Sequence, residues 1–316
     1  MDEHEIIIIG AGPAGSACAS VLHRAGKDVL ILEKESFPRL KLCAGWVTPG
    51  IFRALNTSPR RYPFGILRYS ALHFFLWGRR ISVPTRQYSI RRTEFDRWLL
   101  GLSGAPVEIH EVRQIHQKDG YFVIDGRYRC RYLVGAGGTN CPVYRALFRE
   151  QSPRDPSQLI VTLEEEFPYP YRDARCYLWF FDNDLPGYAW YVPKANGYLN
   201  LGIGGKQELL RQRGQTIREH WQRYLEKLRR INLIDDRYTP APKGHAYYLR
   251  HEHSTVQKGR AYLVGDAAAV ATLDMGEGIY PSILSGIAAA RAILKGEEYC
   301  LKPVPRYSFP KILFPL

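Results

Sequence analysis

A glycine-rich turn near the start of the chain constrains the fold more than any other feature. Residues 10–15 read G-A-G-P-A-G and directly follow the isoleucine run of residues 6–9. A β-branched run that ends in glycine is typical of a buried parallel strand. The Ala-, Ser- and Cys-rich stretch 13–25 then predicts a helix that stops near Gly26, and residues 28–33 predict a second strand. The opening of the chain therefore predicts a βαβ unit.

Each glycine of this turn has a physical role beside a dinucleotide pyrophosphate. Gly10 permits the tight turn, Gly12 lacks the Cβ that would block the pyrophosphate, and Gly15 lets the helix pack closely on the strand. The helix N-terminus then presents its N–H groups and positive dipole end to the phosphates. Glu33 ends the second strand, where a carboxylate can accept the ribose hydroxyls. The residues of this segment that we expect to bind the cofactor are Gly10, Gly12, Pro13, Ala14, Gly15, Glu33 and Lys34.

A second strand-and-glycine unit narrows the choice of cofactor. Residues 261–264 predict a strand that enters Gly265-Asp266, ahead of a small-residue helix at about 277–295. This pattern resembles the Gly-Asp motif of FAD-dependent oxidoreductases of the p-hydroxybenzoate-hydroxylase type, in which the aspartate binds the ribityl chain. A helix start near flavin N1 would stabilise the charge of the reduced ring. The resemblance implies FAD, whereas a purely structural alternative makes Asp266 a helix N-cap. We expect the FAD to be non-covalent, because no histidine or cysteine stands in a recognised covalent-attachment setting. The residues expected to bind FAD here are Gly265, Asp266, Gly276, Gly278 and Ile279.

Four further motifs point to one family within this class. Residues 41–45 read K-L-C-A-G and resemble the K-x-C-G-G segment of the geranylgeranyl reductase family. Residues 187–194 read G-Y-A-W-Y-V-P-K and resemble its Y-x-W-x-F-P-K motif, and the N-L-G-I-G run at 200–204 continues the match. The R-T-E-F-D run at 92–96 resembles the family's R-x-x-F-D. The resemblance extends from residue 5 to about 296.

The resemblance implies an α/β fold with a Rossmann-type FAD-binding domain and a mostly antiparallel β-sheet substrate domain. It implies hydride transfer from reduced flavin to a carbon–carbon double bond of an isoprenoid or other hydrophobic substrate, which basic groups would hold if it were phosphorylated. By the same resemblance, Cys43 lies beside the flavin ring, either as a proton donor or as a pocket wall, and Tyr188 and Trp190 line the substrate cavity. The expected catalytic residues are thus Cys43, Tyr188 and Trp190, and the further cofactor-binding residues are Lys41, Ala44, Gly45 and Arg92.

Each of these motifs also has a purely structural interpretation. Cys43 is a small hydrophobe that can serve packing alone. Tyr188 and Trp190 share one face of a strand and can be ordinary core residues. Lys194 follows a proline and can be a solvated turn residue, and the acidic run 164–166 has the composition of an exposed strand end.

The glycine turns at the two ends of the chain predict a discontinuous FAD-binding domain. Between them lies an aromatic, strand-rich block, followed by a strongly basic helix at 206–231 that we expect to cover a sheet with its other face in solvent. The predicted FAD-binding segments are 1–60, 88–156 and 252–300; the predicted substrate-binding segments are 61–87 and 157–251; and residues 301–316 form a C-terminal tail.

The source of electrons is less clearly indicated. Gly137 stands where related flavin hydroxylases carry an aspartate linked to binding of FAD and NAD(P)H, which disfavours direct reduction by nicotinamide. The six cysteines are scattered, without the close spacing of an iron–sulfur cluster. The electron donor is therefore NAD(P)H or a reduced ferredoxin-like carrier. The formal charge of +13 suits an acidic electron-transfer protein or contact with an anionic membrane surface.

Two other functions remain open. A flavin-dependent monooxygenase would use the same cofactor through a C4a-hydroperoxide. A flavin-binding maturation or partner protein is a third alternative, because the chain ends about 20 residues after the flavin-facing helix, where typical family members continue.

Composition excludes several other classes. No apolar run approaches the roughly 20 residues of a membrane-spanning helix, and the acidic start lacks the basic region of a secretory signal. We therefore expect a cytoplasmic protein, with peripheral membrane contact as an option. No C-x-x-C pair is present and the H-E-H run at 251–253 lacks helical ligand spacing, so no metal site is predicted. No motif indicates nucleic-acid binding.

Overall fold

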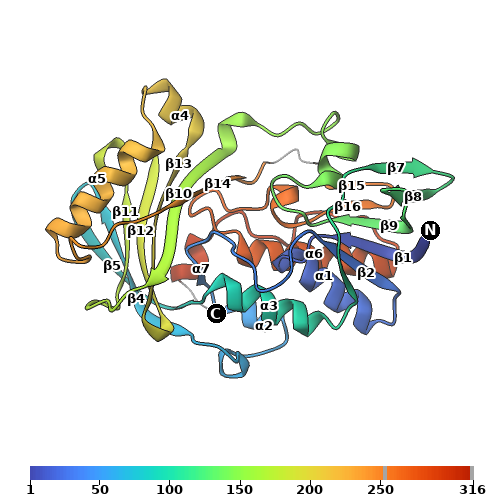
Figure 1. Cartoon of the computed structure of the whole chain (residues 1–316), viewed down its shortest axis with the longest axis horizontal. Helices are drawn as coiled ribbons and strands as arrows, with labels where there is room; N and C mark the ends of the chain where they lie inside the picture. The colour runs from blue at the N-terminus through green and yellow to red at the C-terminus, as the bar shows by residue number, and fades with distance from the viewer. Residues whose placement is uncertain (252–254, 314–316) are drawn as a thin grey trace. The chain divides into compact units, whose positions relative to one another are not determined.

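The computed structural model describes residues 1–251 and 255–313, and the chain forms two compact units (Figure 1). Each unit is built from segments that are distant in the sequence. Unit 1 consists of Met1–Arg39, Thr93–Asp155 and Tyr248–Ser308, and unit 2 consists of Leu40–Arg92, Pro156–Tyr247 and Phe309–Leu316.

The sheet of unit 1 has the strand order β15-β16-β9-β1-β2-β6, with the hairpin β7-β8 attached to β9. Strands β16, β9, β1, β2 and β6 of this sheet are parallel to one another. The strand bounds are β1 Asp2–Ile9, β2 Val29–Glu33, β6 Val107–Ile109, β7 Ile115–Lys118, β8 Tyr121–Ile124, β9 Tyr128–Gly135, β15 Gln257–Lys258 and β16 Ala261–Leu263. The predicted βαβ opening is confirmed.

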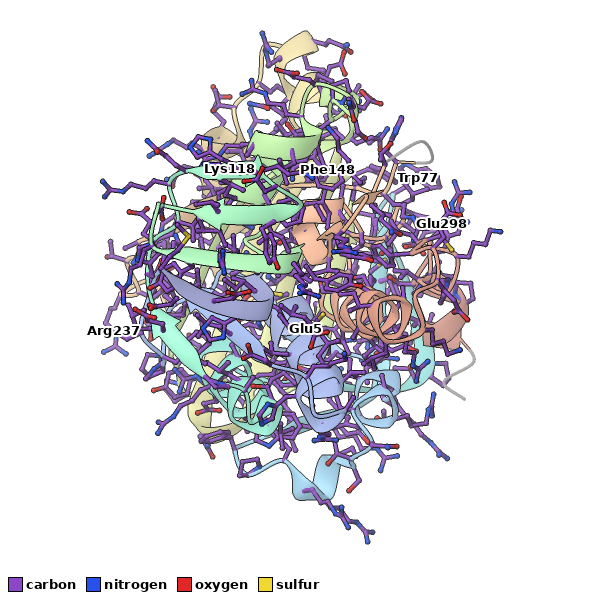
Figure 2. The ribbon with its side chains drawn as sticks, turned by 90° about the vertical axis from the view of Figure 1, so that its right-hand side faces the viewer. Glu5, Trp77, Lys118, Phe148, Arg237 and Glu298 are labelled. Carbon is purple, nitrogen blue, oxygen red and sulfur yellow. The ribbon has the colours of Figure 1, made fainter. Side chains whose placement is uncertain are left out.

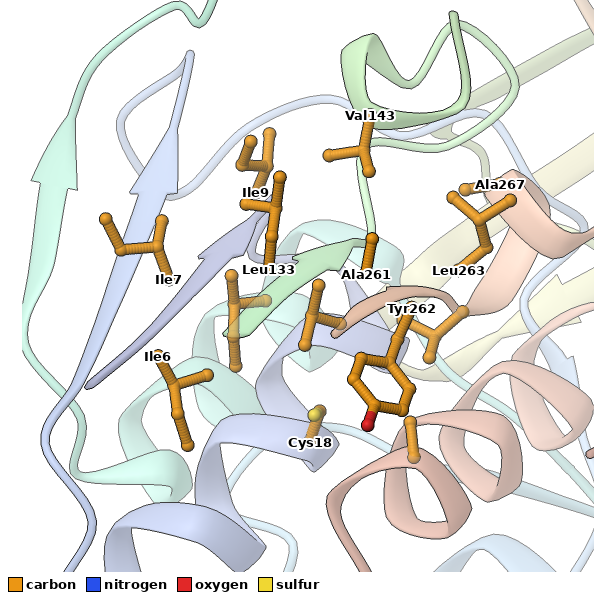
Figure 3. Close-up of a cluster of buried hydrophobic side chains, with 14 of the residues drawn as sticks. Ile6, Ile7, Ile9, Cys18, Leu133, Val143, Ala261, Tyr262, Leu263 and Ala267 are labelled. Carbon is orange, nitrogen blue, oxygen red and sulfur yellow. The ribbon is translucent and has the colours of Figure 1, made fainter. Parts of the chain in front are cut away.

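Close packing of small residues brings the helices of unit 1 together. A Cβ placed on Gly286 would lie 2.2 Å from the carbonyl oxygen of Ala14, so only glycine allows α1 and α6 to approach this closely. Figure 3 shows the core between these helices and the sheet, where Ile6, Cys18 and Leu133 are fully buried. The helices are α1 Pro13–Arg24, α3 Arg92–Ser103, the π-helix η2 Tyr144–Phe148, η6 Gly265–Ala268 and α6 Ile279–Lys295.

The sheet of unit 2 is mostly antiparallel, as predicted, with the order β14-β10-β13-β12-β11-β4-β5-β3. In the described part of this sheet, β11 pairs with β4 in parallel, whereas β10–β13, β13–β12, β12–β11, β4–β5 and β5–β3 are antiparallel pairs. The strands are β3 Trp46–Val47, β4 Leu67–Leu76, β5 Arg79–Ser89, β10 Leu159–Pro168, β11 Cys176–Phe180, β12 Gly187–Lys194, β13 Tyr198–Lys206 and β14 Lys243–Tyr248.

The basic segment 206–231 forms two helices, which corrects the prediction of one. Helix α4 spans Gln207–Gln212 and α5 spans Ile217–Arg230. Gly214 adopts φ +62° between them, and Thr216 begins α5 with a capping box. The apolar face of α5 covers one face of the sheet through Trp221, Tyr224 and other buried residues (Figure 1). The remaining helices are α2 Gly50–Ala54, α7 Phe309–Leu313 and the short 3₁₀ turns η1 Pro59–Arg61, η3 Pro156–Gln158, η4 Asp182–Asp184 and η5 Ala195–Gly197.

The unit boundaries differ from the predicted domain boundaries at 60 and 87. Unit 2 takes in residues from Leu40 because β3 pairs with β5, and the backbone N–H of Ile90 donates to the carbonyl of Gly45 at 2.8 Å. The predicted tail 301–316 is divided between the units, since Ile312 accepts a hydrogen bond from Thr85 in unit 2. The predicted boundary at residue 252 and the residues 314–316 lie outside the described residues. Within the described part of the chain, no helix has the length and apolarity needed to cross a bilayer.

Candidate functional site

The three glycines of the unit 1 loop differ in why glycine is needed: two are required by packing and one leaves space for a ligand. A Cβ on Gly10, which has φ +106°, would lie 2.5 Å from the carbonyl oxygen of Ala136, and a Cβ on Gly15 would lie 1.9 Å from that of Gly10. These two glycines are required by packing. A Cβ on Gly12, by contrast, meets nothing nearer than the Arg39 guanidinium at 3.7 Å. The space beside Gly12 therefore suits a ligand phosphate at the start of α1, whose N-terminus has no side-chain cap.

Glu33 contacts this loop through its side chain. Its carboxylate is buried and accepts hydrogen bonds from the backbone N–H of Ala11 at 2.7 Å and of Glu35 at 3.3 Å. The Arg39 guanidinium lies 3.9 Å from it. Pro13 and Ala14 are buried in the first turn of α1. Lys34 is different, because its ammonium is exposed and pairs with Glu35 at 3.0 Å.

The Gly-Asp turn lies beside the same helix. A Cβ on Gly265, at φ +62°, would approach the Ala14 Cβ to 2.9 Å, so the two glycine turns meet at the start of α1. The Asp266 Oδ1 lies 3.6 Å from the Cβ position of Gly278, the N-cap of α6. Asp266 is thus not the N-cap of this helix but lies next to its N-terminus. Ile279 begins α6 as a buried residue, and Gly276 takes φ +61° in the turn before it.

Arg154 holds this region together, and the sequence motifs did not indicate it. Its guanidinium donates to the carbonyl oxygens of Thr139 and Ala267, the latter at 3.1 Å. It also lies 4.0 Å above the Tyr144 ring and 5.0 Å from that of Tyr248. Arg154 therefore ties the glycine turn after β9 to the Gly-Asp turn. No local pattern distinguishes it from the other arginines of this basic chain.

In unit 2, the 41–45 segment meets the aromatic strand β12 and its neighbour β13. The Trp190 indole N–H donates to the Asn200 Oδ1 at 2.7 Å, and the Asn200 Nδ2 donates to the Cys43 carbonyl at 3.4 Å. Cys43 itself is half-buried, and its Sγ accepts a weak hydrogen bond from the N–H of Gly45. The structure thus brings together two of the three expected catalytic residues through an asparagine.

Tyr188 and Trp190 lie on the sheet face opposite to the core under α5, which contains their neighbours Ala189 and Tyr191. The Trp190 indole occupies the space above Gly202, where a Cβ would lie 2.1 Å from the ring. The Tyr188 ring stacks on Phe180, with the ring centroids 4.8 Å apart. Both aromatic side chains therefore belong to a separate surface of the sheet.

Glu164 lies in one cross-strand row with Gly202 and Trp190, and the sequence motifs did not indicate it. It pairs with Gly202, which in turn pairs with Trp190. Its side chain is 2% exposed, and its Oε2 has no hydrogen-bond partner. Burial raises the pKa of Glu164 to about 8, against the opposing pull of Lys194 and other cations. The expectation of an exposed strand end at 164–166 is therefore wrong at this residue, because strand alternation turns it inward.

A buried ion pair lies next to Glu164. Lys194 is fully buried, not a solvated turn residue, and its Nζ contacts the Glu166 carboxylate at 2.5 Å. The Arg91 Nε binds the same carboxylate at 2.8 Å. Burial alone would raise the pKa of Glu166, but these two cations hold it below its ordinary value. A Cβ on Gly45, at φ +66°, would lie 2.2 Å from the backbone carbonyl oxygen of Ile90 and 2.6 Å from the Lys194 Nζ, so this glycine is also required by packing.

Two of the other predicted cofactor residues of unit 2, Lys41 and Arg92, lie close enough to Glu164 for their charges to oppose the rise of its pKa. The Lys41 Nζ lies 3.0 Å from the His245 Nε2, Ala44 is partly buried, and Arg92 is buried at the start of α3. Of the H-E-H run, only His251 is among the described residues. Throughout the described part of the chain, no group of three or more His, Cys, Asp or Glu side chains is placed to hold a metal ion.

The fold and the two glycine turns define a Rossmann-type, dinucleotide-binding flavoprotein class. A family model described as an NAD(P)-binding Rossmann-like domain matches residues 8–60. An uncharacterized protein of Methanosarcina barkeri is 31% identical over 311 residues, covering 93% of this chain and 75% of the relative. Menaquinone reductase of Mycobacterium tuberculosis is 27% identical over 317 residues, covering 92% of this chain and 77% of the relative.

The fold also matches a solved structure. A geranylgeranyl bacteriochlorophyll reductase-like protein from Thermoplasma acidophilum superposes with a TM-score of 0.81 at 19% identity, covering 94% of this chain and 80% of that one. The chain belongs to the geranylgeranyl reductase-like family of FAD-dependent oxidoreductases, which has the p-hydroxybenzoate-hydroxylase-type fold.

Proposed function

We propose that the protein reduces carbon–carbon double bonds of an isoprenoid or other hydrophobic substrate. The observation that carries this proposal is the row of Glu164, Gly202 and Trp190, which sets a protonated carboxyl group beside an aromatic surface. Reduced FAD supplies the hydride for such a reaction. The protein must then supply a proton, and an apolar wall suits the hydrocarbon chain. The reductase name of the mycobacterial relative agrees with this proposal.

The residues of unit 1 fit FAD. The space beside Gly12 would hold the pyrophosphate, the buried Glu33 would accept ribose hydroxyls, and Asp266 at the N-terminus of α6 would bind the ribityl chain. In unit 2 we propose that Lys41, Gly45 and Ala44 contact the cofactor as a short backbone segment.

Glu164 is the proton source in this proposal. Its carboxyl group is neutral below about pH 8 and has an oxygen without a protein partner. Loss of its proton to the substrate carbon leaves a carboxylate, which the buried Lys194 stabilises by charge attraction. Trp190 and Tyr188 orient the substrate, and Asn200 fixes the indole of Trp190.

Product analysis tests the proposed function. The purified yellow protein is incubated with isoprenoid diphosphates and quinones bearing isoprenoid chains, with a chemical reductant, with and without oxygen. We expect products that gain two hydrogen atoms without oxygen consumption. A product that gains an oxygen atom with matching oxygen uptake would establish the monooxygenase instead, and binding without turnover would favour the maturation role.

Substitution of Cys43 separates a pocket wall from a proton donor. With Glu164 as the proton source, Cys43→Ser and Cys43→Ala should keep FAD and lose less than about tenfold in turnover, since general acid catalysis itself contributes roughly 10²–10⁴-fold. Turnover and the flavin absorption spectrum are the measurements. A loss of hundredfold or more in both variants, with Glu164→Gln still active, would assign the proton to the thiol.

We further propose that an acidic ferredoxin-like or flavodoxin-like protein reduces the flavin. Aspartate is sterically disfavoured at Gly137, where a Cβ would lie 3.2 Å from the Cα of Cys141, so the hydroxylase-type contact is absent at this position. Reduction by ferredoxin should slow as salt screens the formal charge of +13. Stopped-flow recording of flavin bleaching measures the rate of flavin reduction by ferredoxin and by NADPH. Rapid, stoichiometric bleaching by NADPH alone would refute this proposal.

A further inference from the structure

Unit 2 exposes a cluster of large apolar side chains away from the face that carries Trp190. Trp77 is 80% exposed, Phe181 is 50% exposed and Ile231 is 43% exposed. The rings of Trp77 and Phe181 stack with centroids 6.5 Å apart, and Figure 2 labels Trp77. All three residues line one open cavity of about 560 Å³. We call Trp77, Phe181 and Ile231 the rim patch.

The backbone makes this exposure costly. Trp77 adopts φ +48° in the turn between β4 and β5, and Phe181 adopts φ +55° directly after β11. This left-handed region favours glycine and asparagine and disfavours bulky residues. Two aromatic residues at such positions, with most or half of their surface in water, add nothing to the core. Their placement therefore indicates a role outside the unit.

Exposed arginines directly neighbour the rim patch in the sequence, and Arg80 lines the same cavity. Arg79 and Arg80 follow the Trp77 turn, and Arg230 precedes Ile231; all three are exposed. The acidic groups that line the same cavity are already paired, since Asp182 binds the Lys227 Nζ at 2.8 Å and Asp173 pairs with Arg175. The patch thus combines aromatic rings with positive charge. Aromatic side chains favour the headgroup region of bilayers, and basic residues favour anionic lipids.

We propose that the rim patch docks on an anionic phospholipid surface. Trp77 and Phe181 would enter the interface between headgroups and acyl chains, while Arg79, Arg80 and Arg230 contact the phosphates. This inference goes beyond the proposed reaction and does not depend on it. The basic composition indicated membrane contact as an option but not which residues would make it, and the proposal assigns that contact to the rim patch.

Sedimentation of the full-length flavin-loaded protein with vesicles tests the proposal. We expect binding to vesicles that contain phosphatidylglycerol, and weaker binding to phosphatidylcholine alone or at high salt. The double variant Trp77→Asn, Phe181→Asn should lose about tenfold or more of this binding, because apolar contact with the interface is removed. Asparagine suits the left-handed backbone, so the variant should also fold at least as well as the parent.

Two controls make the result decisive. Ile109→Asn replaces an apolar side chain that is 56% exposed on β6 of unit 1, and it should bind vesicles as the parent does. Trp77→Phe should retain most binding. Equal vesicle binding by the double variant and the parent would overturn the proposal. Failure of the parent to bind anionic vesicles would do the same and would point to a protein partner.

Discussion

Gly12→Val should yield folded protein that has lost its flavin. A Cβ at this position meets no protein atom nearer than the end of the flexible Arg39 side chain at 3.7 Å, so we expect the fold to tolerate the substitution. In the proposed binding mode, a pyrophosphate held by the start of α1 would have no room to move aside. Overpacking costs about 1–3 kcal/mol, so flavin affinity should fall roughly 5- to 150-fold. The flavin-to-protein absorbance ratio and the circular dichroism spectrum are the measurements.

Gly101→Val is the matched control for this experiment. A Cβ on Gly101 in α3 of the same unit meets no atom within 4 Å, so the same change there should leave the flavin content unaltered. A yellow Gly12→Val protein with parental flavin content would contradict the assignment of the pyrophosphate. Acid precipitation of the parent should release its flavin to the supernatant, since we propose that binding is non-covalent.

Glu164→Gln should lower turnover by about 10²–10⁴-fold with FAD still bound, the usual contribution of a general acid. Glutamine keeps the size and polarity of the side chain but has no acidic proton. In the parent, turnover should fall as the pH rises through about 8, because Glu164 then loses its proton. The residual activity of the variant should not show this fall in turnover at high pH. Turnover against pH is the measurement.

The thermal stabilities of the parent protein and of Glu164→Gln provide a second test of the Glu164 pKa, which needs no substrate. The pKa of Glu164 is raised from 4.5 to about 8 on folding, so the folded state binds the extra proton between these values. This contribution to the free energy of unfolding is complete below about pH 4.5 and is lost as the pH rises through about 8. Thermal unfolding of Glu164→Gln should lack this dependence, and the variant should be more stable than the parent above pH 8.

Glu165→Gln is the control for both measurements. Glu165 lies on the opposite face of β10 and accepts hydrogen bonds from the Tyr238 hydroxyl at 2.6 Å and from the N–H of Ala241 at 2.8 Å. Glutamine can still accept both bonds, so activity and its pH profile should match those of the parent. If Glu164→Gln also matched the parent, Glu164 would be a structural residue and the proton would come from elsewhere.

Local patterns predicted the parts of the molecule that short segments determine. The βαβ opening and the roles of Gly10 and Gly15 follow from a few consecutive residues and from backbone geometry. The ion pair between the exposed Lys34 ammonium and the neighbouring Glu35 is equally local, and a role for Lys34 in cofactor binding stays a prediction. Whether Gly12, Asp266 and the other expected site residues bind FAD stays a prediction that the substitutions above address.

The site residues that could not be predicted from the sequence owe their positions to contacts with residues distant along the chain. The acidic run 164–166 is highly charged and therefore resembled an exposed strand end, yet the register of β10 against β13 sets Glu164 opposite Gly202. Lys194 became buried because Glu166, distant in sequence, supplies a partner. Arg154 acts through carbonyl groups from two other segments. None of these contacts leaves a periodic pattern in the chain.

The order of strands in unit 1 has a consequence for synthesis on the ribosome. Strand β1 pairs with β2 at residue 29 on one side, but its partner on the other side, β9, begins at residue 128. At about 5–20 residues per second, translation of the intervening residues takes roughly 6–24 s. An apolar strand edge stays unpaired for that time and can aggregate. The nascent chain should therefore need protection by a chaperone long before the nucleotide-binding sheet is complete.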